Sequence, residues 1–559
     1  MKKKILLSKI AILALLAFAL CVQASPAKRI IIFSGRPGFT QSRDFKETIA
    51  SPPGKVLRVD RTQADLTITA WNRNEISVDA RIEVGDSDKE FLAEFLDNSK
   101  LSLAPDAGGY LLRLETPMDK DGGDDAWNLP RRIQAAIRSG TWNFSFSARL
   151  DIRVPTELSL DVENSFGDVL VQGVSGKHDI RNESGKVKVE NCGGDLRLRT
   201  SFASAEVTDF KGAVDVNNSS GEVDLKNISG RADVRNSFKT VTFNRIGGPL
   251  TVTSESSDVL GSEVAGDCLI TSSFKTIDVR GVQGRLAVMG ESSQVTVDDV
   301  KKDAVIEASF KPVRVTNVQA GLRVTAESCP LTAANIGGDA RIKSSFQEIT
   351  AAGVRGSVTV DGESCSVSVR DIDGNATIAS SFKDVDVANI GGTLDVRSGS
   401  AKVTAVNVKK GTSIVSSFNS IEVREAGGDV RVDGDSSSVL VDGVEGNVDI
   451  KNSFKYVTLK RTCGSIKVVG DSSGVEVAQI KKLPAGSSVD IRTSFKPIQI
   501  ALPADADVTI QARTEFGKIR SDFPVLLGEE DGKSVKIESG KGGVTVKLET
   551  SSNITIKKE

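Results

Sequence analysis

The stretch SFKTIDVRGVQGRLAVMGESSQVTVDDVKKDAVIEASFK, from Ser273 to Lys311, contains one full copy of the pattern that decides the fold. It begins with Ser-Phe-Lys, passes through Glu-Ser-Ser at its middle and ends with Ser-Phe-Lys again. Ser292 lies midway between Phe274 and Phe310. The repeating unit is therefore half of the interval between these two phenylalanines, and it alternates between a Phe version and a Ser version.

The same pattern extends over most of the chain. Phenylalanine recurs at the interval that separates Phe274 from Phe310, each time directly after a serine, and another serine lies halfway to the next phenylalanine. Self-similarity at a short fixed period is typical of solenoids, in which each repeat stacks on its neighbours. The positions that we expect to form one structural ladder are Phe166, Phe202, Phe238, Phe274, Phe310, Phe346, Phe382, Phe418, Phe454, Ser184, Ser220, Ser256, Ser292, Ser328, Ser364, Ser400, Ser436 and Ser472.

Each unit contains two short stretches in which apolar and polar residues alternate, such as Ile277 to Val279 and Leu286 to Val288. Alternation with period two and β-branched residues indicates short strands. One such unit can form one turn of a β-coil whose strands pair in parallel with the coils above and below, at a spacing of about 4.8 Å. The sequence therefore predicts an all-β, single-stranded parallel β-helix (a β-solenoid) with about 18 residues per coil. We expect right-handed coiling, because parallel crossover connections are almost always right-handed.

The ladder residues are expected to point into the coil, together with the apolar residues 3, 5, 8, 12 and 14 positions after each of them. An inward phenylalanine in every coil would crowd the next one, whereas alternation with serine leaves about 9.6 Å between rings. On this interpretation the rings and hydroxyl groups form a column inside the core.

Charged residues flank the ladder and alternate in sign from coil to coil. The simplest interpretation is a solvated, mutually neutralising face that discourages aggregation, and the alternative is a repetitive binding strip for a polymer. The lysines that follow phenylalanines are Lys239, Lys275, Lys311, Lys383 and Lys455, and the acids that precede serines are Glu183, Glu255, Glu291, Glu327, Glu363, Asp435 and Asp471.

The segments around the array predict four regions. Residues 1–24 have the lysine-rich start, apolar run and small residues of a secretory signal peptide. Residues 25–155 are expected to form a β-rich N-terminal cap with helical insertions at 88–99 and 124–140. Residues 156–486 form the regular solenoid, with an insertion near 482–486, and residues 487–559 form the last coils and a cap. Caps are expected because open solenoid ends expose unpaired strand edges.

The composition limits which binding partners and which cellular compartment the sequence predicts. Lys and Arg total 72 against 74 for Asp and Glu, with both signs interspersed, which gives no indication of a nucleic-acid partner. No stretch after the leader has the run of about 18 consecutive apolar residues that a membrane helix needs. The five cysteines after residue 24 are scattered and include no CxxC pair, so neither a disulfide framework nor a zinc site is predicted. We expect an exported protein, located in the periplasm, at the cell surface or outside the cell.

The residues that could carry chemistry are few, and we expect no catalytic residue, cofactor or metal. His178 is the only histidine, and its neighbour Asp179 should face the other way on a strand, so a structural role is expected. The acidic loops 119–125 and 371–375 lack the glutamate that closes a calcium-binding loop and are expected to be solvated turns. Trp71, Trp127 and Trp142 are expected in the core or cap of the N-terminal region rather than on a sugar-stacking surface.

Four segments resemble the bacterial adhesin-like β-solenoid family, exported domains of largely unknown function: TITAWNRNEISVDARI (67–82), RLDIRVPTELSLDVENSFGDVLVQGVSG (149–176), FGKIRSDFP (516–524) and GKGGVTVKLETSSNITI (540–556). The resemblance extends from about Val56 to the C-terminus. It implies an exported solenoid and supplies no catalytic residues.

The leading functional hypothesis is a non-enzymatic adhesin or envelope structural protein. Its repetitive surface would bind an unidentified polymer or an envelope or surface protein at many sites at once, so that avidity supplies affinity. The alternatives are a polysaccharide-active β-helix enzyme and a periplasmic scaffold or sensor partner of a membrane system.

Overall fold

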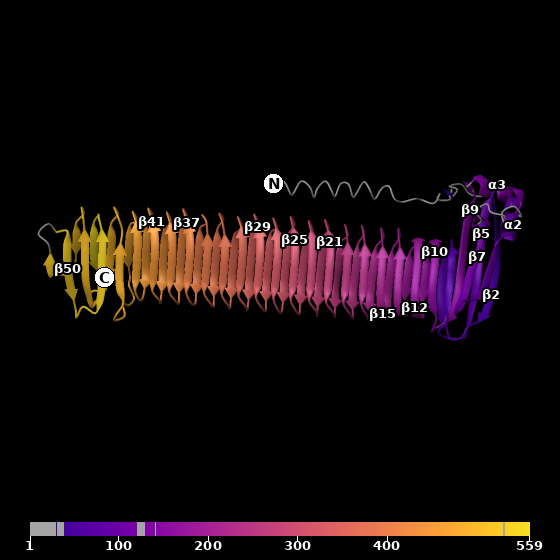
Figure 1. Cartoon of the computed structure of the whole chain (residues 1–559), viewed down its shortest axis with the longest axis horizontal. Helices are drawn as coiled ribbons and strands as arrows, with labels where there is room; N and C mark the ends of the chain where they lie inside the picture. Colours follow the sequence, from indigo (N-terminus) through magenta and orange to yellow (C-terminus); the bar gives the residue numbers. More distant parts are fainter. Residues whose placement is uncertain (1–28, 31–37, 120–128, 140, 143, 529–531) are drawn as a thin grey trace. The chain divides into compact units, whose positions relative to one another are not determined.

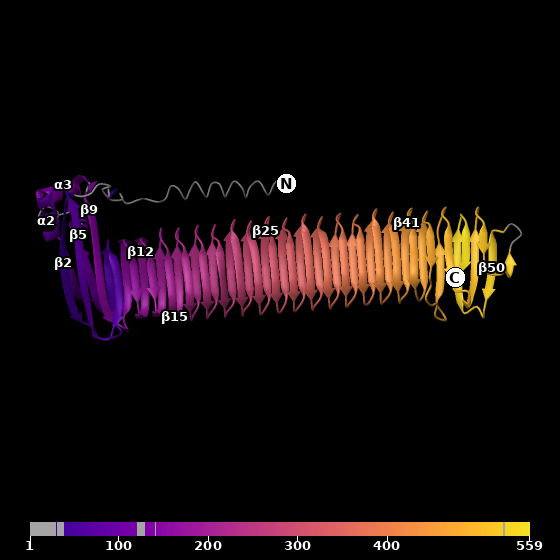
Figure 2. The same cartoon turned by 180° about the vertical axis from the view of Figure 1, so that it is seen from behind.

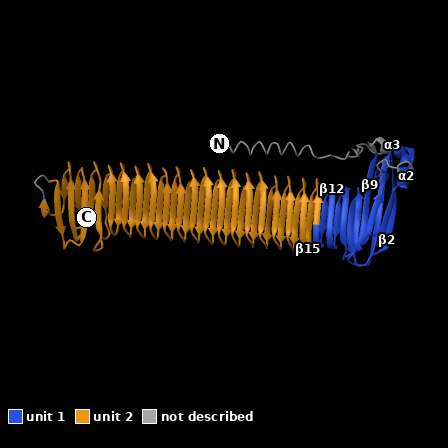
Figure 3. Cartoon of the chain, viewed as in Figure 1, with its two compact units in different colours: residues 1–196 blue, residues 197–559 orange. Residues whose placement is uncertain are grey.

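The computed structural model describes residues 29–30, 38–119, 129–139, 141–142, 144–528 and 532–559. The predicted signal peptide lies outside these residues. The chain is all-β apart from short helices, and its strands stack in parallel, each residue beside the one at the same position of the next coil. The predicted fold class, a β-solenoid with coils of about 18 residues, is confirmed (Figures 1 and 2). Two compact units are present, residues 1–196 and 197–559, which are coloured separately in Figure 3.

Each coil of the second unit contains two strands, which form two faces. In the coil that begins at Phe274, β22 (Thr276–Val282) belongs to the first face and β23 (Leu286–Glu291) to the second. β22 pairs in parallel with β24 (Gln294–Val300), and β23 with β25 (Ala304–Ser309), always in a register of one coil. Backbone groups are therefore satisfied by the coils above and below, as a solenoid requires.

The two faces run through the second unit as separate stacks. In spatial order the first face contains β16 (Val223–Ile228), β18 (Val241–Ile246), β20 (Val259–Val264), β22, β24, β26 (Val313–Val318), β28 (Leu331–Ile336), β30 (Glu348–Val354), β32 (Ser366–Ile372), β34 (Val385–Ile390), β36 (Val403–Val408), β38 (Ser420–Ala426), β40 (Ser438–Val444), β42 (Val457–Thr462), β44 (Val475–Ala478), β46 (Ile498–Leu502), β52 (Ile554–Lys558) and β48 (Ile519–Ser521). The second face contains β17 (Ala232–Asn236), β19 (Leu250–Ser254), β21 (Cys268–Ser273), β23, β25, β27 (Leu322–Glu327), β29 (Ala340–Ser345), β31 (Val358–Glu363), β33 (Ala376–Ser380), β35 (Leu394–Ser398), β37 (Thr412–Ser417), β39 (Val430–Asp435), β41 (Val448–Ser453), β43 (Ile466–Asp471), β45 (Ser488–Arg492), β51 (Val544–Thr550) and β47 (Val508–Thr514). β15 (Ala205–Asn218) continues from the first face into the second, and β14 spans Gly193–Thr200.

The core lies between the two faces and consists of the apolar residues that the alternation predicted. Ile277, Val279, Val282, Leu286 and Val288 are all buried, and so are nearly all the corresponding residues of the other coils, Gly261 being an exception. Inward positions 3, 5, 8, 12 and 14 of the unit are therefore confirmed. The ladder position itself is not inward, as described below.

The last strands of the chain do not stack in sequence order. The pair formed by β51 and β52 lies between the pair β45–β46 and the pair β47–β48. Beyond β47 the strands become antiparallel, through β50 (Ser534–Ser539) and β49 (Leu527–Gly528). The final coil thus inserts into the stack, and a short antiparallel edge ends it.

The first unit begins its coils with β3 (Val56–Thr62) and β4 (Asp65–Trp71) and continues with β10 (Ser159–Phe166), β11 (Val169–Gln172), β12 (Ser175–Ser184) and β13 (Val187–Glu190). Antiparallel strands precede and accompany these coils: β2 (Phe39–Ala50) and β9 (Ser145–Pro155) pair with β5 (Glu75–Asp86), and β6 (Lys100–Asp106) pairs with β7 (Gly109–Glu115). The short strands β1 (Arg29–Ile30) and β8 (Thr141–Trp142) pair with each other.

Both predicted helical insertions contain a helix. α2 (Lys89–Asp97) begins after Asp88, whose carboxylate accepts hydrogen bonds from two backbone N–H groups of the first turn, and it buries Leu92 and Phe95. α3 spans Arg131–Ser139, and a 3-10 turn, η1, spans Pro117–Asp119. The ring of Phe95 packs 5.0 Å from that of Phe144 on the loop before β9.

Candidate binding surface: the aromatic corner

The predicted ladder lies on the surface and not in the core, which corrects the inward orientation expected from the sequence. All nine phenylalanines of the ladder are exposed; in the second unit the exposed fractions run from 55% for Phe346 to 73% for Phe202. Each phenylalanine occupies the corner where a second-face strand ends and the next first-face strand begins. Each ladder serine occupies the same corner of the following coil. We call this column in the second unit the aromatic corner.

At six phenylalanine corners of the second unit the backbone conformation accounts for the outward side chain, whereas Phe202, Phe238 and Phe382 are exposed without a positive φ. Phe274, Phe310 and Phe346 have φ values of 67°, 62° and 64°. In this left-handed region the chain reverses direction sharply. The side chain therefore no longer follows the inward and outward alternation of the preceding strand, and it points into solvent at the corner. A bulky residue rarely adopts a positive φ, because its Cβ then crowds the following carbonyl group.

At several of the phenylalanine corners the turn is closed by a hydrogen bond across a single residue. The Lys311 N–H donates to the Ser309 carbonyl oxygen at 2.8 Å, and the corresponding bonds follow Phe346, Phe454 and Phe495. Such three-residue turns with a positive central φ are rare and strained. Strain of this kind at an exposed phenylalanine lowers folding stability, and it is the type of feature that often accompanies a functional surface.

The serine corners are built differently. Ser292 also has a positive φ, of 54°, but the next residue, Ser293, turns inward and is fully buried, and its N–H donates to the Gly290 carbonyl oxygen at 3.3 Å. Glycine suits position 290, because a Cβ there would approach Ser293 and Ile277 to within 3.3 Å. Buried residues in the position of Ser293 recur as Ser257, Cys329, Cys365, Ala401, Ser437 and Ser473.

The two corner types fit each other inside the core, and this fit explains why the repeat spans two coils. Two residues before a phenylalanine, a buried polar side chain donates a hydrogen bond to the backbone of the serine corner in the preceding coil. Ser272 Oγ donates to the Ser257 carbonyl oxygen at 2.9 Å, and Ser380 Oγ donates to that of Cys365 at 2.9 Å. Asn452 Nδ2 makes the same bond to Ser437. A serine corner is therefore the natural neighbour of a phenylalanine corner.

The alternation persists where the strands leave sequence order. In space Phe495 is followed by Ser551 and then by Phe516, because the last coil of the chain inserts between the other two. Ser551 Oγ accepts a hydrogen bond from the Phe495 N–H at 2.9 Å, and its carbonyl oxygen accepts one from the Phe516 N–H at 3.3 Å. Both rings are exposed, by 72% and 79%. The spacing of rings is thus a property of the folded surface and not only of the sequence repeat.

The charges predicted beside the ladder lie on the two sides of the corner. The lysines stand where the first-face strands begin, whereas acids such as Glu291 and Glu327 end second-face strands. Both sets are exposed, and among the described residues none of the ion pairs joins one set to the other. Lys383 Nζ instead donates to the Phe346 carbonyl oxygen, two coils away, at 2.9 Å. Within the described residues, the two sets therefore flank the corner as exposed charges without direct ion pairs between them.

The other corner of the coil carries a polar column that sequence reasoning missed. Seven residues after each ladder residue, the backbone again has a positive φ, at residues such as Asn227, Arg245 and Glu263. The signal was present in the sequence, because this position is Gly, Asn, Asp or another polar residue in every coil. Many of these side chains bond along the column, as between Asn407 and Asn389 at 2.8 Å.

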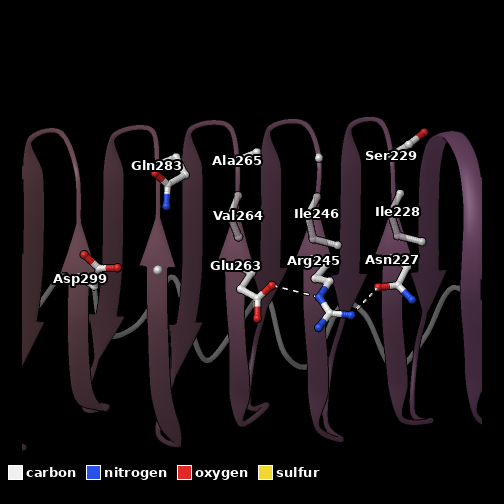
Figure 4. A pocket seen from close by; sticks show the side chains of 12 residues that line it. Asn227, Ile228, Ser229, Arg245, Ile246, Glu263, Val264, Ala265, Gln283 and Asp299 are labelled. Atoms are coloured by element: carbon white, nitrogen blue, oxygen red, sulfur yellow. Dashed lines mark hydrogen bonds and ion pairs between the residues drawn. The ribbon is translucent and has the colours of Figure 1, made fainter.

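A groove of about 560 Å³ follows this polar column over five coils (Figure 4). Arg245 lies in it between two partners: its Nε donates to Glu263 at 3.1 Å, and one of its terminal nitrogens donates to Asn227 at 3.5 Å. Isoleucine and valine side chains form the floor. The charged groups of this column pair with one another. We therefore assign the column a structural role, in which its side chains stabilise the corner between neighbouring coils.

His178 occupies an inward position on β12, in register with Leu160, and is 1% exposed. Among the described residues neither of its ring nitrogens has a hydrogen-bond partner. Burial therefore lowers the pKa of His178, and the nearby backbone groups of Val174 and Gly193 oppose this only in part. The neutral imidazole fills space in the core.

His178→Leu is expected to stabilise the protein, and more so in acid. The unfolded chain takes up a proton near pH 6.5 and the folded chain does so only at lower pH, so falling pH favours unfolding of the wild type. Leucine continues the Leu160 column and removes this effect. Urea unfolding at pH 7.5 and pH 5.0 measures the difference between variant and wild type, which should grow at the lower pH. An equal difference at both values would contradict the assignment.

The remaining candidates are dispersed. Of the cysteines in the described ranges, four are buried free thiols and Cys463 is half-buried; burial raises the pKa of Cys268 to about 12. Trp71 ends β4 and donates to the Glu75 carbonyl oxygen at 2.8 Å, Trp142 lies in β8, and Trp127 lies outside the described residues. Most of the loop 119–125 also lies outside them. Asp371 accepts a hydrogen bond from Asn389 in the polar column.

Within the described ranges, no group of three or more His, Cys, Asp or Glu residues is arranged to hold a metal ion. The same residues include no helix long and apolar enough to cross a membrane. Comparisons with protein families, with curated proteins and with solved structures found no match to this chain.

Proposed function

We propose that this chain is a non-enzymatic interaction protein that binds its partner through the aromatic corner. One observation carries the proposal: the order ring, serine, ring is kept through Phe495, Ser551 and Phe516, where the chain itself runs out of order. A sequence repeat alone would not place Ser551 between these two rings. A requirement for regularly spaced rings on the surface accounts for it.

The energetic cost of the corner supports the same proposal. Monomeric proteins rarely expose a long contiguous apolar row, and such rows usually mark interaction sites. Here several of the residues that carry these exposed rings also have a positive φ. Neither feature stabilises the coil, whereas both present ring faces and edges to a partner.

The mechanism is multivalent. Each pair of coils offers one ring, one gap and a few charges, so a single contact is weak. Because the contacts are held on one stack, the second and later contacts form at a high effective concentration, and total affinity rises steeply with their number. We place this activity at the cell envelope or outside the cell, on the basis of the leader-like residues 1–24 and the adhesin-like resemblance; fractionation of native cells tests that placement.

The proposal is tested by removing rings in steps. Variants with two, four and eight corner phenylalanines replaced by serine are compared for retention on immobilised polysaccharides, cell-envelope fractions and the immobilised chain itself. The logarithm of the dissociation constant should rise in proportion to the number of rings removed. A matched control replaces Leu260, Leu269, Met289 and Val305, which are exposed apolar residues on the faces. Retention that responds equally to both series, or to neither, would contradict the proposal.

A further inference from the structure

The aromatic corner is complementary to itself. In the second unit it has ten rings, and a serine stands between each ring and the next; the rings belong to Phe202, Phe238, Phe274, Phe310, Phe346, Phe382, Phe418, Phe454, Phe495 and Phe516. Coils are spaced by about 4.8 Å, so neighbouring rings are about 9.6 Å apart. Aromatic rings pack against each other with centroids about 4.5–7 Å apart. A ring inserted into each gap would therefore lie at packing distance from both neighbours.

A second copy of the chain supplies rings at the required spacing. If two corners face each other and one is shifted by a single coil, every ring of one chain lies opposite a serine of the other. The rings of both chains then form one continuous stack with a repeat of about 4.8 Å. Without the shift, rings oppose rings and the gaps above the serines remain empty.

The charges select the orientation. Lysines such as Lys311 stand on the first-face side of the corner, and acids such as Glu327 stand on the second-face side. When two chains run parallel and face each other, the first-face side of one lies beside the second-face side of the other. With the one-coil shift, lysines then lie beside acids on both flanks. In an antiparallel pair, lysines would lie beside lysines and acids beside acids, which is unfavourable.

The available area is sufficient for a stable pair. Each ring residue in the second unit is more than half exposed, and a phenylalanine can bury about 150–250 Å². Ten rings therefore offer roughly 1,000 Å² per chain, compared with the about 800 Å² per partner of a standard interface. The charged flanks add to this area.

We propose that the partner of the aromatic corner is a second copy of this chain, parallel to the first and shifted by one coil. The inference rests on the proposed function, since it takes the corner to be a binding surface. A shifted pair is not a symmetric dimer in the strict sense. Each chain nevertheless places its rings opposite the serines of the other. The reason is that the corner repeats every two coils, so a shift of one coil up or down gives the same contacts.

Sedimentation velocity over a range of concentrations tests the pairing with the full chain. The wild type should form a dimer, and replacing Phe310, Phe346, Phe382 and Phe418 by serine should weaken dimerisation by at least about 100-fold. The variant with Leu260, Leu269, Met289 and Val305 replaced should dimerise as the wild type does. Circular dichroism and thermal unfolding confirm that each variant is folded. A wild type that stays monomeric, or a four-ring variant that dimerises normally, would overturn the pairing.

Orientation is measured with one spin label per chain. Glu476 is exposed near one end of the regular array, and a label at Glu476→Cys, in a chain that also carries Cys463→Ser, should show a short distance to its copy in a parallel pair. A label–label separation close to the full length of the array would overturn the parallel arrangement.

The outcomes for the two proposals can be told apart. A monomeric chain whose retention on a polysaccharide or an envelope fraction still falls with each ring removed overturns the second copy as partner and leaves the proposed function in place. A chain in which ring removal changes neither dimerisation nor retention overturns both.

Discussion

Ile306→Asp is expected to remove at least about 4 kcal/mol from the free energy of unfolding, whereas Val305→Asp, one residue earlier on β25, should change it by less than about 1 kcal/mol. Ile306 is fully buried between Val288 and Val324 of the neighbouring coils. An aspartate there would place a carboxylate in the core with no partner. Val305 points outward and is paired in register with Arg323, which can accept a carboxylate beside it.

The comparison is made by urea unfolding monitored by circular dichroism, under conditions in which the chain is monomeric. The two substitutions introduce the same group into adjacent aliphatic positions. Their effects on strand propensity and on net charge are therefore the same and cancel when the two variants are compared. Similar losses for the two variants would show that the faces of β25 are assigned wrongly.

The second large effect has the opposite sign. Replacing Phe274, Phe310, Phe346 and Phe418 by asparagine should raise the free energy of unfolding of the monomer, by about 2 kcal/mol or more in total. All four residues are more than half exposed, so each substitution loses less apolar burial than one in the core would, and all four have φ values between 62° and 67°. Asparagine accepts this conformation more readily than phenylalanine does.

A buried phenylalanine supplies the control for that series. Phe210 lies on β15 and is fully buried, so Phe210→Ala should cost about 3–5 kcal/mol. If the four corner substitutions together destabilised the monomer by a comparable amount, the rings would be core residues after all. Their exposure, and the binding surface built on it, would then be wrong.

The sequence was sufficient for the coil and its core because both follow from alternation. Ile277 and Val279 set the phase of one strand, and Leu286 and Val288 set the phase of the other. In each strand the β-branched residues identify the inward side, and the constant length of the unit brings equal positions into register. Both helical insertions could be predicted for a similar reason, since α2 has a capping aspartate and helical spacing of its apolar residues.

The orientation of the corner could not be obtained in the same way. Counting back by twos from Ile277 makes Lys275 an inward residue, whereas counting forward by twos from Cys268 and Ile270 makes Phe274 inward. The two strands that meet at the corner are out of phase, so alternation gives no consistent answer there. A positive φ resolves the conflict, and it does so differently in the two coil types, since Ser293 turns inward while Lys275 remains exposed.

The position of the last coil was also beyond sequence reasoning. Nothing in the order of strands shows that β51 and β52 insert between two earlier pairs, because that placement depends on which edges remain open when the stack forms. The segment Thr550-Ser551-Ser552 nevertheless resembles the serine corner Glu291-Ser292-Ser293 and could have identified Ser551 as a ladder residue.

Hydroxyl-radical footprinting, read by mass spectrometry at single residues, tests the central claim most directly. In a dilute solution of the full chain, the rings of Phe274, Phe310 and Phe382 should be oxidised readily, while Phe210 and Phe95 should be protected. At high concentration the corner rings should become protected as the second copy covers them. Corner rings that are as protected as Phe210 in the dilute chain would place them inside the coil and contradict the account.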